Sequence, residues 1–282
     1  MCGITGVVDS LNVRDAVSGI EAMTEALRHR GPNDHGSWSD LDVGIALGHA
    51  RLSILDLSSA GHQPMRSRHE RFVITFNGEI YNYKALTAEL KSKGHIFSGS
   101  SDTEVILAAF EEWGVQSATE RFNGMFAFGV WDRTDRSLYL ARDRMGEKPL
   151  YYGWNSGLFL FASELKALTA HPRFNASIDR NAAALGLRYS YIPAPWSIYR
   201  DVYKVTPGSI LRLSVSEMGA PPASFSPNAS LIKKGIHPEY YWKPPGLIFS
   251  DSPSQFVGSD QDAAAELGSL LRDAVSIRMV SD

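Results

Sequence analysis

The chain has 282 residues, of which 44% are hydrophobic and 21% are charged, and its formal net charge is −3. This composition is typical of a soluble globular protein, and the small negative charge gives no reason to expect binding to nucleic acid or to an anionic membrane. A single cysteine excludes an intramolecular disulfide and a multi-cysteine zinc site. Because no stretch approaches the roughly 20 apolar residues of a membrane helix and no signal-peptide pattern opens the chain, we expect a cytoplasmic protein.

Hydrophobic periodicity predicts both helices and strands. In chain order, the first half of the sequence predicts a strand, a helix, two strands and two helices at residues 2–8, 18–27, 43–49, 72–76, 83–93 and 102–113. The second half predicts antiparallel hairpins, two helices, a strand and a final amphipathic helix at residues 125–131, 137–142, 150–153, 158–162, 163–166, 179–188, 209–215 and 260–279. Two helix layers around two layers of mostly antiparallel sheet account for residues 1–170. The sequence therefore predicts an α+β sandwich.

Several polar patterns have an ordinary structural explanation. Ser18–Glu21 and Ser101–Glu104 are capping-box patterns that predict helix starts, and Asp102 is then an acidic residue in a first helical turn. Asn77-Gly78 follows a strand and is first of all a turn signal. The basic corner at 28–34 is explained by cations at a helix C-terminus, and whether it also forms a pocket wall stays open.

Cys2 is the residue with the clearest chemical potential. If Met1 is removed, a thiol and a free α-amine lie on the same residue. The amine has an ordinary pKa near 8, so it can act as a base that generates the nucleophilic thiolate. A lone cysteine is more often a small buried hydrophobe, and taken by itself Cys2 favours that explanation.

The common cofactor motifs are missing from the sequence. We find no G-x-x-x-x-G-K-[ST], no G-x-G-x-x-G after a strand and no H-E-x-x-H. The eight histidines lack metal-ligand spacing, and no basic patch interleaves with aromatic residues. We therefore expect no metal, no cofactor and no nucleic acid in this chain, so any chemistry must come from Cys2 and polar loop residues.

Eight motifs in order carry a family resemblance. They are Cys2-Gly-Ile, Arg28-His-Arg-Gly-Pro-Asn-Asp, Gly48-His-Ala-Arg-Leu-Ser-Ile, Phe76-Asn-Gly-Glu-Ile-Tyr-Asn, Ser101-Asp-Thr-Glu, Phe122-Asn-Gly-Met-Phe-Ala-Phe, Ala141-Arg-Asp-Arg-Met-Gly-Glu-Lys-Pro-Leu-Tyr-Tyr and Ala162-Ser-Glu-Leu-Lys-Ala-Leu. Together they resemble the N-terminal glutaminase domain of glutamine-hydrolysing asparagine synthetases. That family consists of class II amidotransferases, and the resemblance implies the four-layer αββα sandwich of N-terminal nucleophile hydrolases.

The resemblance implies a role for each matching residue. It makes Cys2 the nucleophile that hydrolyses L-glutamine to glutamate and ammonia, with Asn77 and Gly78 as oxyanion donors. It assigns Arg51 to the substrate α-carboxylate, and Asp102 with Glu79 to the α-ammonium. The backbone around Leu52 and Ile54 is implied to line the same pocket.

The resemblance also has a limit. The family binds ATP with a Ser-Gly-Gly-x-Asp-Ser loop, and no Ser-Gly-Gly occurs in this chain. We therefore expect a fragment of a longer synthetase, with ATP and Mg needed only by the absent part. The expected organisation is a glutaminase domain at 1–215, a proline-rich linker at 216–258 and the first helix of the synthetase domain at 259–282.

Two other functions stay open at the level of sequence. The same glutaminase could serve a different carboxylate acceptor in a polysaccharide or secondary-metabolite pathway, or the chain could be a non-catalytic glutamine-binding module. The motifs do not decide between these acceptors. The chain's own synthetase domain is the implied partner, and a homodimer is one arrangement that the resemblance allows.

Overall fold

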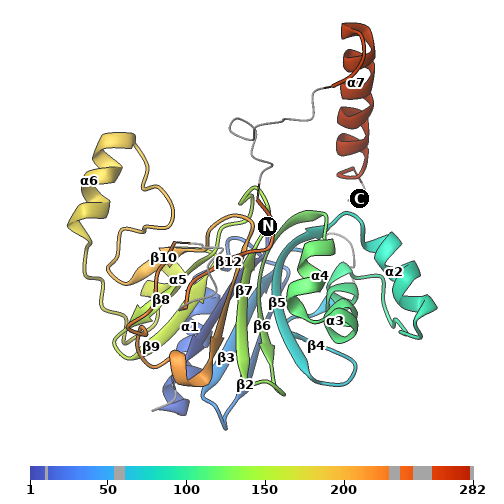
Figure 1. Cartoon of the computed structure of the whole chain (residues 1–282). Coiled ribbons are helices and arrows are strands. Elements are labelled where there is room, and N and C mark those ends of the chain that lie inside the picture. The colour runs from blue at the N-terminus through green and yellow to red at the C-terminus, as the bar shows by residue number, and fades with distance from the viewer. Residues whose placement is uncertain (10–11, 54–60, 229–235, 244–255, 280–282) are drawn as a thin grey trace.

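The chain folds into four layers (Figure 1), and this computed structural model describes residues 1–9, 12–53, 61–228, 236–243 and 256–279. Two antiparallel sheets face each other, and helices cover both outer faces (Figure 1). The first sheet has the strand order β10 (Val202–Lys204), β8 (Tyr151–Asn155), β9 (Leu158–Ala162), β1 (Gly3–Val8), β3 (Ile45–Arg51) and β2 (Asp34–Asp40). The second has the order β12 (Glu239–Tyr240), β11 (Ser209–Ser214), β7 (Ser137–Arg142), β6 (Gly124–Asp132), β5 (Phe72–Ile80) and β4 (Met65–Arg66).

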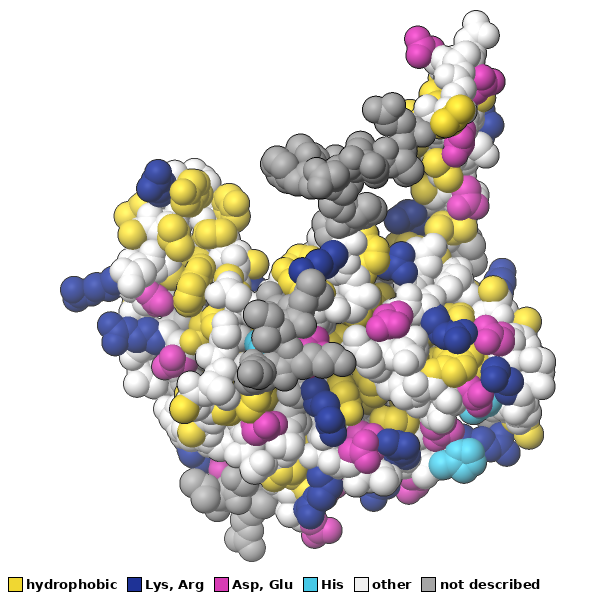
Figure 2. Space-filling model, viewed as in Figure 1, with side chains coloured by type: hydrophobic (Ala, Val, Ile, Leu, Met, Phe, Trp, Pro, Cys, Tyr) yellow, Lys and Arg dark blue, Asp and Glu magenta, His cyan; other side chains and the backbone are white. Residues whose placement is uncertain are grey.

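The helices form the outer layers and two projections. Helices α1 (Val13–Glu25) and α5 (Leu165–Thr169) cover the first sheet, and α3 (Asp102–Trp113), α4 (Val115–Arg121) and α2 (Tyr83–Ser92) cover the second. Helices α6 (Arg180–Tyr189) and α7 (Asp260–Ser276) project from the sandwich (Figure 1). Apolar side chains gather on α6 at the surface (Figure 2). None of the described helices is long and apolar enough to cross a membrane.

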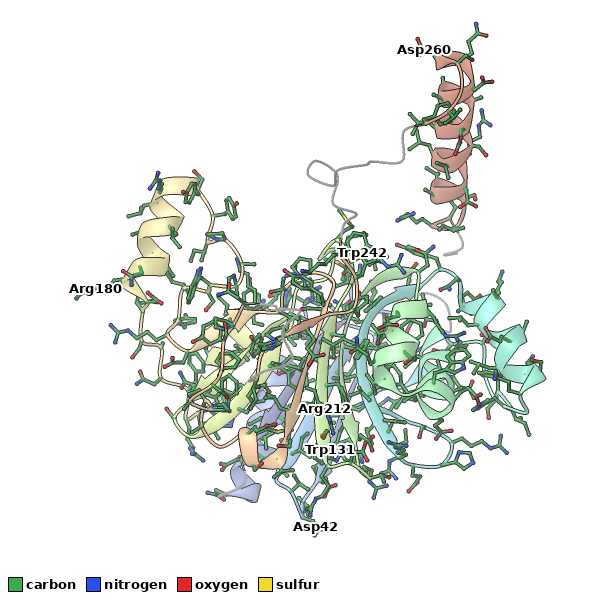
Figure 3. All side chains as sticks on the ribbon, viewed as in Figure 1. Asp42, Trp131, Arg180, Arg212, Trp242 and Asp260 are labelled. Atoms are coloured by element: carbon green, nitrogen blue, oxygen red, sulfur yellow. The ribbon has the colours of Figure 1, made fainter. Side chains whose placement is uncertain are left out.

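Three hydrophobic cores correspond to the three interfaces between the layers. The central core joins the inner faces of the two sheets, and it includes Ile4 and Leu47 from the first sheet with Trp131 and Leu140 from the second (Figure 3). A second core lies between the second sheet and α2, α3 and α4, and a third lies between the first sheet and α1 and α5. The predicted αββα sandwich is therefore confirmed.

Phe161 joins the two sheets at their centre. Its fully buried ring lies over two glycines, so that a Cβ on Gly6 of β1 would lie 2.1 Å from the ring and one on Gly129 of β6 would lie 2.5 Å from it. Because no side chain fits in that space, the absence of a Cβ at these positions sets the distance between the sheets.

Some element boundaries differ from the sequence prediction. Helix α1 begins at Val13 rather than at Ser18, which lies within the helix, and Asn12 precedes it with its N–H donating to Asp9 Oδ1 at 2.9 Å. Strand β2 is not predicted from the sequence, because Asp34–Asp40 is polar and half-buried, as an edge strand can be. The short elements α4, β10 and β12 were also not predicted.

The expectation of a turn at Asn77-Gly78 was wrong. Both residues belong to β5, where Asn77 lies opposite Ala127 and Gly78 lies opposite Phe126 of β6. A Cβ on Gly78 would lie 2.2 Å from the carbonyl oxygen of Met125, so this glycine allows a close approach of two backbones.

Part of the predicted linker packs on the second sheet and the central core. Met218 is buried in that core, and Phe225 packs against it. The Trp154 indole donates to the carbonyl of Glu217 at 3.0 Å, and the Tyr241 hydroxyl donates to that of Arg142 at 2.9 Å. The boundaries 1–215, 216–258 and 259–282 stay predictions.

We predict that Gly6→Ala lowers the free energy of unfolding by about 1–3 kcal/mol, because the new methyl group overpacks against the Phe161 ring. Urea denaturation followed by tryptophan fluorescence measures the change. Gly219→Ala is the control, since no atom lies within 4 Å of a Cβ there, and it should change stability by less than about 0.5 kcal/mol. Equal effects of the two substitutions would contradict this account of the interface.

Candidate functional site

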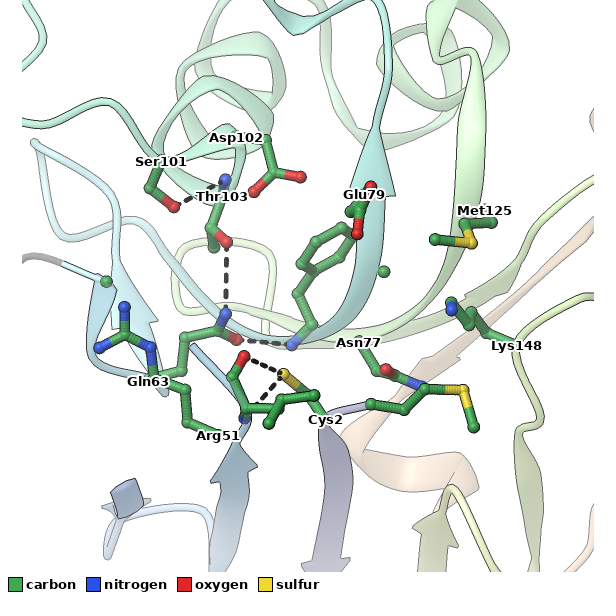
Figure 4. A pocket seen from close by; sticks show the side chains of 15 residues that line it. Cys2, Arg51, Gln63, Asn77, Glu79, Ser101, Asp102, Thr103, Met125 and Lys148 are labelled. Atoms are coloured by element: carbon green, nitrogen blue, oxygen red, sulfur yellow. Dashed lines mark hydrogen bonds between the residues drawn. The ribbon is translucent and has the colours of Figure 1, made fainter. Parts of the chain in front are cut away.

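A cavity of about 240 Å³ lies where strands of both sheets meet the N-terminus of α3 (Figure 4). Its position follows from strand pairing. Because β1 pairs with β3 so that Gly3 lies opposite Ala50, Cys2 is brought beside Arg51 although they are far apart in sequence. The cavity is lined by Met1, Cys2, Arg51, Leu52, Gly61, Gln63, Phe76, Asn77, Gly78, Glu79, Ser101, Asp102, Thr103, Met125 and Lys148.

The Cys2 thiol is held at the floor of this cavity by the backbone of Leu52. Its Sγ accepts a hydrogen bond from the Leu52 N–H at 3.4 Å and lies 3.5 Å from the Leu52 carbonyl oxygen. Burial raises the pKa of the thiol, and the Leu52 contact and the charges of the N-terminus and Arg51 oppose that shift. The thiol therefore needs a base before it can react as a thiolate.

Arg30 fixes the backbone of Cys2. Its Nε donates to the Cys2 carbonyl at 2.9 Å, and its second nitrogen pairs with Glu164 at 2.7 Å. Only 7% of the Arg30 side chain is exposed, whereas 28% of the Glu164 side chain is, so the guanidinium is the shielded partner of the pair. The basic corner at 28–34, left open by the sequence, therefore contributes a buried clamp behind the thiol.

The edge of β5 carries hydrogen-bond donors toward the cavity. The Phe76 N–H donates to Gln63 Oε1 at 2.7 Å, and the Ile80 N–H donates to Asp102 Oδ2 at 3.0 Å. The N–H of Gly78 lies between them and points the same way, because alternate residues of a strand share a direction. The side-chain nitrogen of Asn77 is buried and has no hydrogen-bond partner in the described part of the chain. Two donors therefore converge on the space above Cys2 (Figure 4).

Gln63 connects two walls of the cavity. Besides accepting from Phe76, it donates through Nε2 to Thr103 Oγ1 at 3.2 Å (Figure 4). The carbonyl of Phe76 in turn accepts from Nε2 of His49 at 3.1 Å. Burial lowers the pKa of His49 to about 4, so this imidazole is neutral and Nε2 carries the proton.

Asp102 presents a buried carboxylate at the start of α3. Burial, reinforced by the charge of Glu79, raises its pKa to about 7, although the Ile80 N–H opposes the shift. Ser101 caps the helix by accepting from the Thr103 N–H at 3.2 Å. The predicted capping box is incomplete, because the Glu104 carboxylate accepts from the N–H groups of Ser98 and Gly99 instead.

Arg51 supplies a cation on the opposite side of the cavity from Lys148 (Figure 4). Its side chain is 8% exposed, and Gly61 lies directly behind it, since a Cβ on Gly61 would be 2.1 Å from a guanidinium nitrogen. The Arg51 guanidinium therefore has little room to move toward Gly61.

The structure brings together the described residues that the sequence suggested: Cys2, Arg51, Leu52, Asn77, Gly78, Glu79 and Asp102. Ile54 lies outside the described residues. The roles assigned to all of them stay predictions. Sequence reasoning missed Gln63 and Lys148 as cavity residues. Gln63 stands in a loop without a pattern, and Lys148 belongs to the motif at 141–152, for which the resemblance implied no role. Among the described residues, no group of three His, Cys, Asp or Glu side chains is placed to hold a metal ion.

Comparison with known proteins identifies relatives of this chain. Residues 1–224 match the glutamine amidotransferase domain family. The chain is 35% identical over its whole length to "Asparagine synthetase [glutamine-hydrolyzing] 3" of Bacillus subtilis, of which it covers 42%. It is 34% identical to "Putative asparagine synthetase [glutamine-hydrolyzing] 2" of Methanocaldococcus jannaschii, again over its whole length, and covers 53% of that protein. The chain thus spans about half the length, or less, of these curated relatives.

Solved structures share the fold. The glutamine phosphoribosylpyrophosphate amidotransferase of B. subtilis, complexed with ADP and GMP, superposes with a TM-score of 0.57 at 18% identity. The alignment covers 86% of this chain and 50% of the other. At this level of identity the similarity establishes the fold of the sandwich and nothing more specific.

We predict that Asp102→Asn stabilises the protein more at pH 8 than at pH 5. A pKa of about 7, against 3.8 for an ordinary aspartate, means that stability falls as the pH rises from about 4 to 7 and Asp102 is forced to ionise. The amide cannot ionise and can still accept from Ile80. The difference in unfolding free energy between variant and wild type should be about 1–3 kcal/mol larger at pH 8.

Urea denaturation at the two pH values measures this difference. Asp42→Asn is the control, because Asp42 lies in the β2–β3 turn, at the opposite end of β3 from Arg51 (Figure 3). A pH-independent effect of Asp102→Asn would show that the carboxyl is not held out of water.

Proposed function

This chain belongs to the family of glutamine amidotransferase domains, and we propose that it hydrolyses the side-chain amide of L-glutamine with the Cys2 thiol. One observation carries the proposal: the Cys2 thiol and the Asn77 amide nitrogen line the same cavity, and that nitrogen has no hydrogen-bond partner among the described residues. Acyl transfer requires a nucleophile and an oxyanion donor that face the same carbonyl group, and here Cys2 precedes a strand of the first sheet while Asn77 lies in a strand of the second.

The first chemical step uses the N-terminal amine as a base. Removal of Met1 places the α-amine on Cys2 itself, where it accepts the thiol proton. The sulfur then attacks the amide carbon, and the carbonyl oxygen becomes an oxyanion held by Asn77 Nδ2 and the Gly78 N–H. The protonated amine returns its proton to the leaving nitrogen, so that ammonia departs and a γ-glutamyl thioester remains. Water hydrolyses the thioester to glutamate and regenerates the thiol.

The charged residues of the cavity orient the substrate. Arg51 receives the α-carboxylate, since its planar fork matches a carboxylate in two places. Asp102 and Glu79 receive the α-ammonium, and the bound cation favours the ionised form of Asp102. Leu52 contributes backbone near the thiol, and the role of Ile54 stays a prediction. These roles would bind an α-amino acid with its side chain directed at the thiol.

For the whole protein we propose a glutamine-dependent asparagine synthetase in the cytoplasm. Its remaining part would use ATP and Mg to activate aspartate, which the released ammonia then amidates. The sequence similarity to asparagine synthetases supports this acceptor over the polysaccharide or secondary-metabolite alternative. The homodimer stays a prediction.

We predict that Cys2→Ala abolishes glutamate production from glutamine, because the thioester cannot form. A coupled glutamate assay on protein whose mass confirms the loss of Met1 measures turnover, and Cys2→Ala should still bind glutamine in calorimetry. Turnover retained by Cys2→Ala would mean that another group is the nucleophile. Glutamine binding by a wild-type protein without turnover would instead support the non-catalytic binding module.

We predict that Arg51→Ala raises the KM for glutamine at least about tenfold and changes kcat less, because Arg51 holds a group remote from the reacting amide. Gly61→Ala should act in the same direction, since its methyl group displaces the Arg51 guanidinium. Gly219→Ala is the matched control and should leave both constants unchanged. A fall in kcat alone would assign Arg51 to the chemical step.

A further inference from the structure

Lys148 is a buried cation in the cavity that the proposed mechanism does not use. Its side chain lines the cavity and only 7% of the residue is exposed. In the part of the chain that the structure describes, its ammonium has no ion pair with a carboxylate. Charged groups that are buried without a partner reduce stability, so one that faces a reaction site points to a functional reason.

The loop that carries Lys148 is rigidly built. The Asp143 carboxylate accepts hydrogen bonds from four backbone N–H groups, those of Phe126, Met145, Glu147 and Lys148, at 2.8–3.2 Å. Arg142 holds the same loop from its carbonyl side, with donors to Lys148 and Gly146, each at 2.7 Å, and to Val205 at 3.0 Å. Both backbone groups of Lys148 are therefore fixed, and its side chain is directed into the cavity by a clamped loop (Figure 4).

Lys148 lies at the reacting end of the cavity. Figure 4 shows Asn77 between Cys2 and Lys148, while the Arg51 guanidinium lies on the far side of Cys2. The two cations therefore act on different ends of a bound glutamine. Arg51 faces the proposed carboxylate subsite, whereas Lys148 faces the thiol, the oxyanion donors and the chain terminus, which lines the same cavity.

We propose that the Lys148 ammonium keeps the α-amine of the processed N-terminus neutral and ready to accept the thiol proton. This role rests on the proposed function, and it makes Lys148 a residue that acts through the amine, without touching the bond that breaks. The mechanism is a charge effect: a nearby fixed cation disfavours a second positive charge on the amine.

The charges around the terminus agree with this role. In the chain that still carries Met1, burial lowers the pKa of the Met1 α-amine, the Cys2 thiolate raises it, and Arg30 and Lys148 lower it. These groups come from the loop after α1, from the N-terminal segment itself and from the loop after β7. Loss of Met1 moves the terminal amine by one residue, to the Cys2 nitrogen in the same cavity. Arg30 is already engaged by Glu164 and by the Cys2 carbonyl, so its charge is partly balanced. Among the described residues no carboxylate pairs with Lys148, so its charge acts on the amine without such a balance.

The sign of the effect is testable. Removing the cation raises the pKa of the amine, so less of it is free base at neutral pH and the acid limb of the kcat profile moves to higher pH. We expect Lys148→Met to shift this limb upward by about half a pH unit or more, and to lower kcat at pH 6.5 several-fold. Lys148→Arg keeps the charge and should stay close to wild type. The profile is measured at saturating glutamine, where the substrate ammonium pairs with Asp102. The titration of Asp102 therefore does not contribute to the acid limb.

A direct titration separates this proposal from the proposed function. Cys2 is the only cysteine, so protein labelled with 13C,15N-cysteine gives one residue's signals, and its Cα and nitrogen shifts report protonation of the α-amine. Lys84→Met, which removes an exposed lysine on α2, is the matched control. Lys148→Gln is a second neutral variant if the methionine variant does not fold.

The proposal predicts that the amine titrates at higher pH in Lys148→Met or Lys148→Gln than in wild type, Lys148→Arg and Lys84→Met. Equal titration of the amine in all these proteins would overturn it, as would a lower kcat with an unmoved acid limb. If the titration shifts as expected but no variant hydrolyses glutamine, the effect of Lys148 stands and the proposed function fails.

Discussion

The free edge of β5 is the constraint on which the cavity depends. Strand β4 pairs only with Val73 and Ile74, so the later N–H groups on that edge have no neighbouring strand. Buried N–H groups require partners, and side chains from two other parts of the chain supply them through Gln63 and Asp102. The same bonds that satisfy the backbone thus attach the loop before β4 and the start of α3 to the second sheet. The N–H of Gly78 lies between those two and is directed at the cavity.

The charged residues of the cavity are arranged at a cost to stability. Asp102 and Lys148 are each less than 10% exposed, and burying a charge is unfavourable unless it is paired. The raised pKa of Asp102 reports that cost directly. A ligand that carries an ammonium would offset that cost at Asp102, because its charge would meet the carboxylate in a shielded site. In the function proposed above, glutamine supplies this ammonium.

Much of this fold could be predicted from the sequence, because many of its helices and strands carry a clear hydrophobic pattern of their own. The apolar runs of β6, β7 and β9 and the helical spacing of α3 are strong periodic signals, and those elements lie where they were predicted. The polar strand β2 could not be predicted, since its position depends on pairing with β3 rather than on its own side chains. Asn77-Gly78 shows the same limit: a local turn signal was overridden by the close approach of β6.

Most residues of the candidate site could be predicted from the sequence only where they belong to a motif with an implied role. Cys2, Arg51, Asn77 and Asp102 belong to segments with a family resemblance, and the cavity brings them together. Gln63 acts through tertiary contacts that no short pattern encodes, namely its bonds to Phe76 and Thr103. Lys148 belongs to the motif at 141–152, but its place in the cavity depends on a loop fixed by Asp143, which the motif alone does not show.

Because the only thiol of the chain lines the cavity at the second position, the chain carries its own marker of maturation. While Met1 is attached, the Cys2 nitrogen is an amide and the residue is an ordinary thiol. Once Met1 is lost, Cys2 becomes a 1,2-aminothiol, a functional group that an internal cysteine cannot form. Reagents that condense with 1,2-aminothiols would then react with matured chains alone, and the amount of label would equal the concentration of matured sites in any preparation.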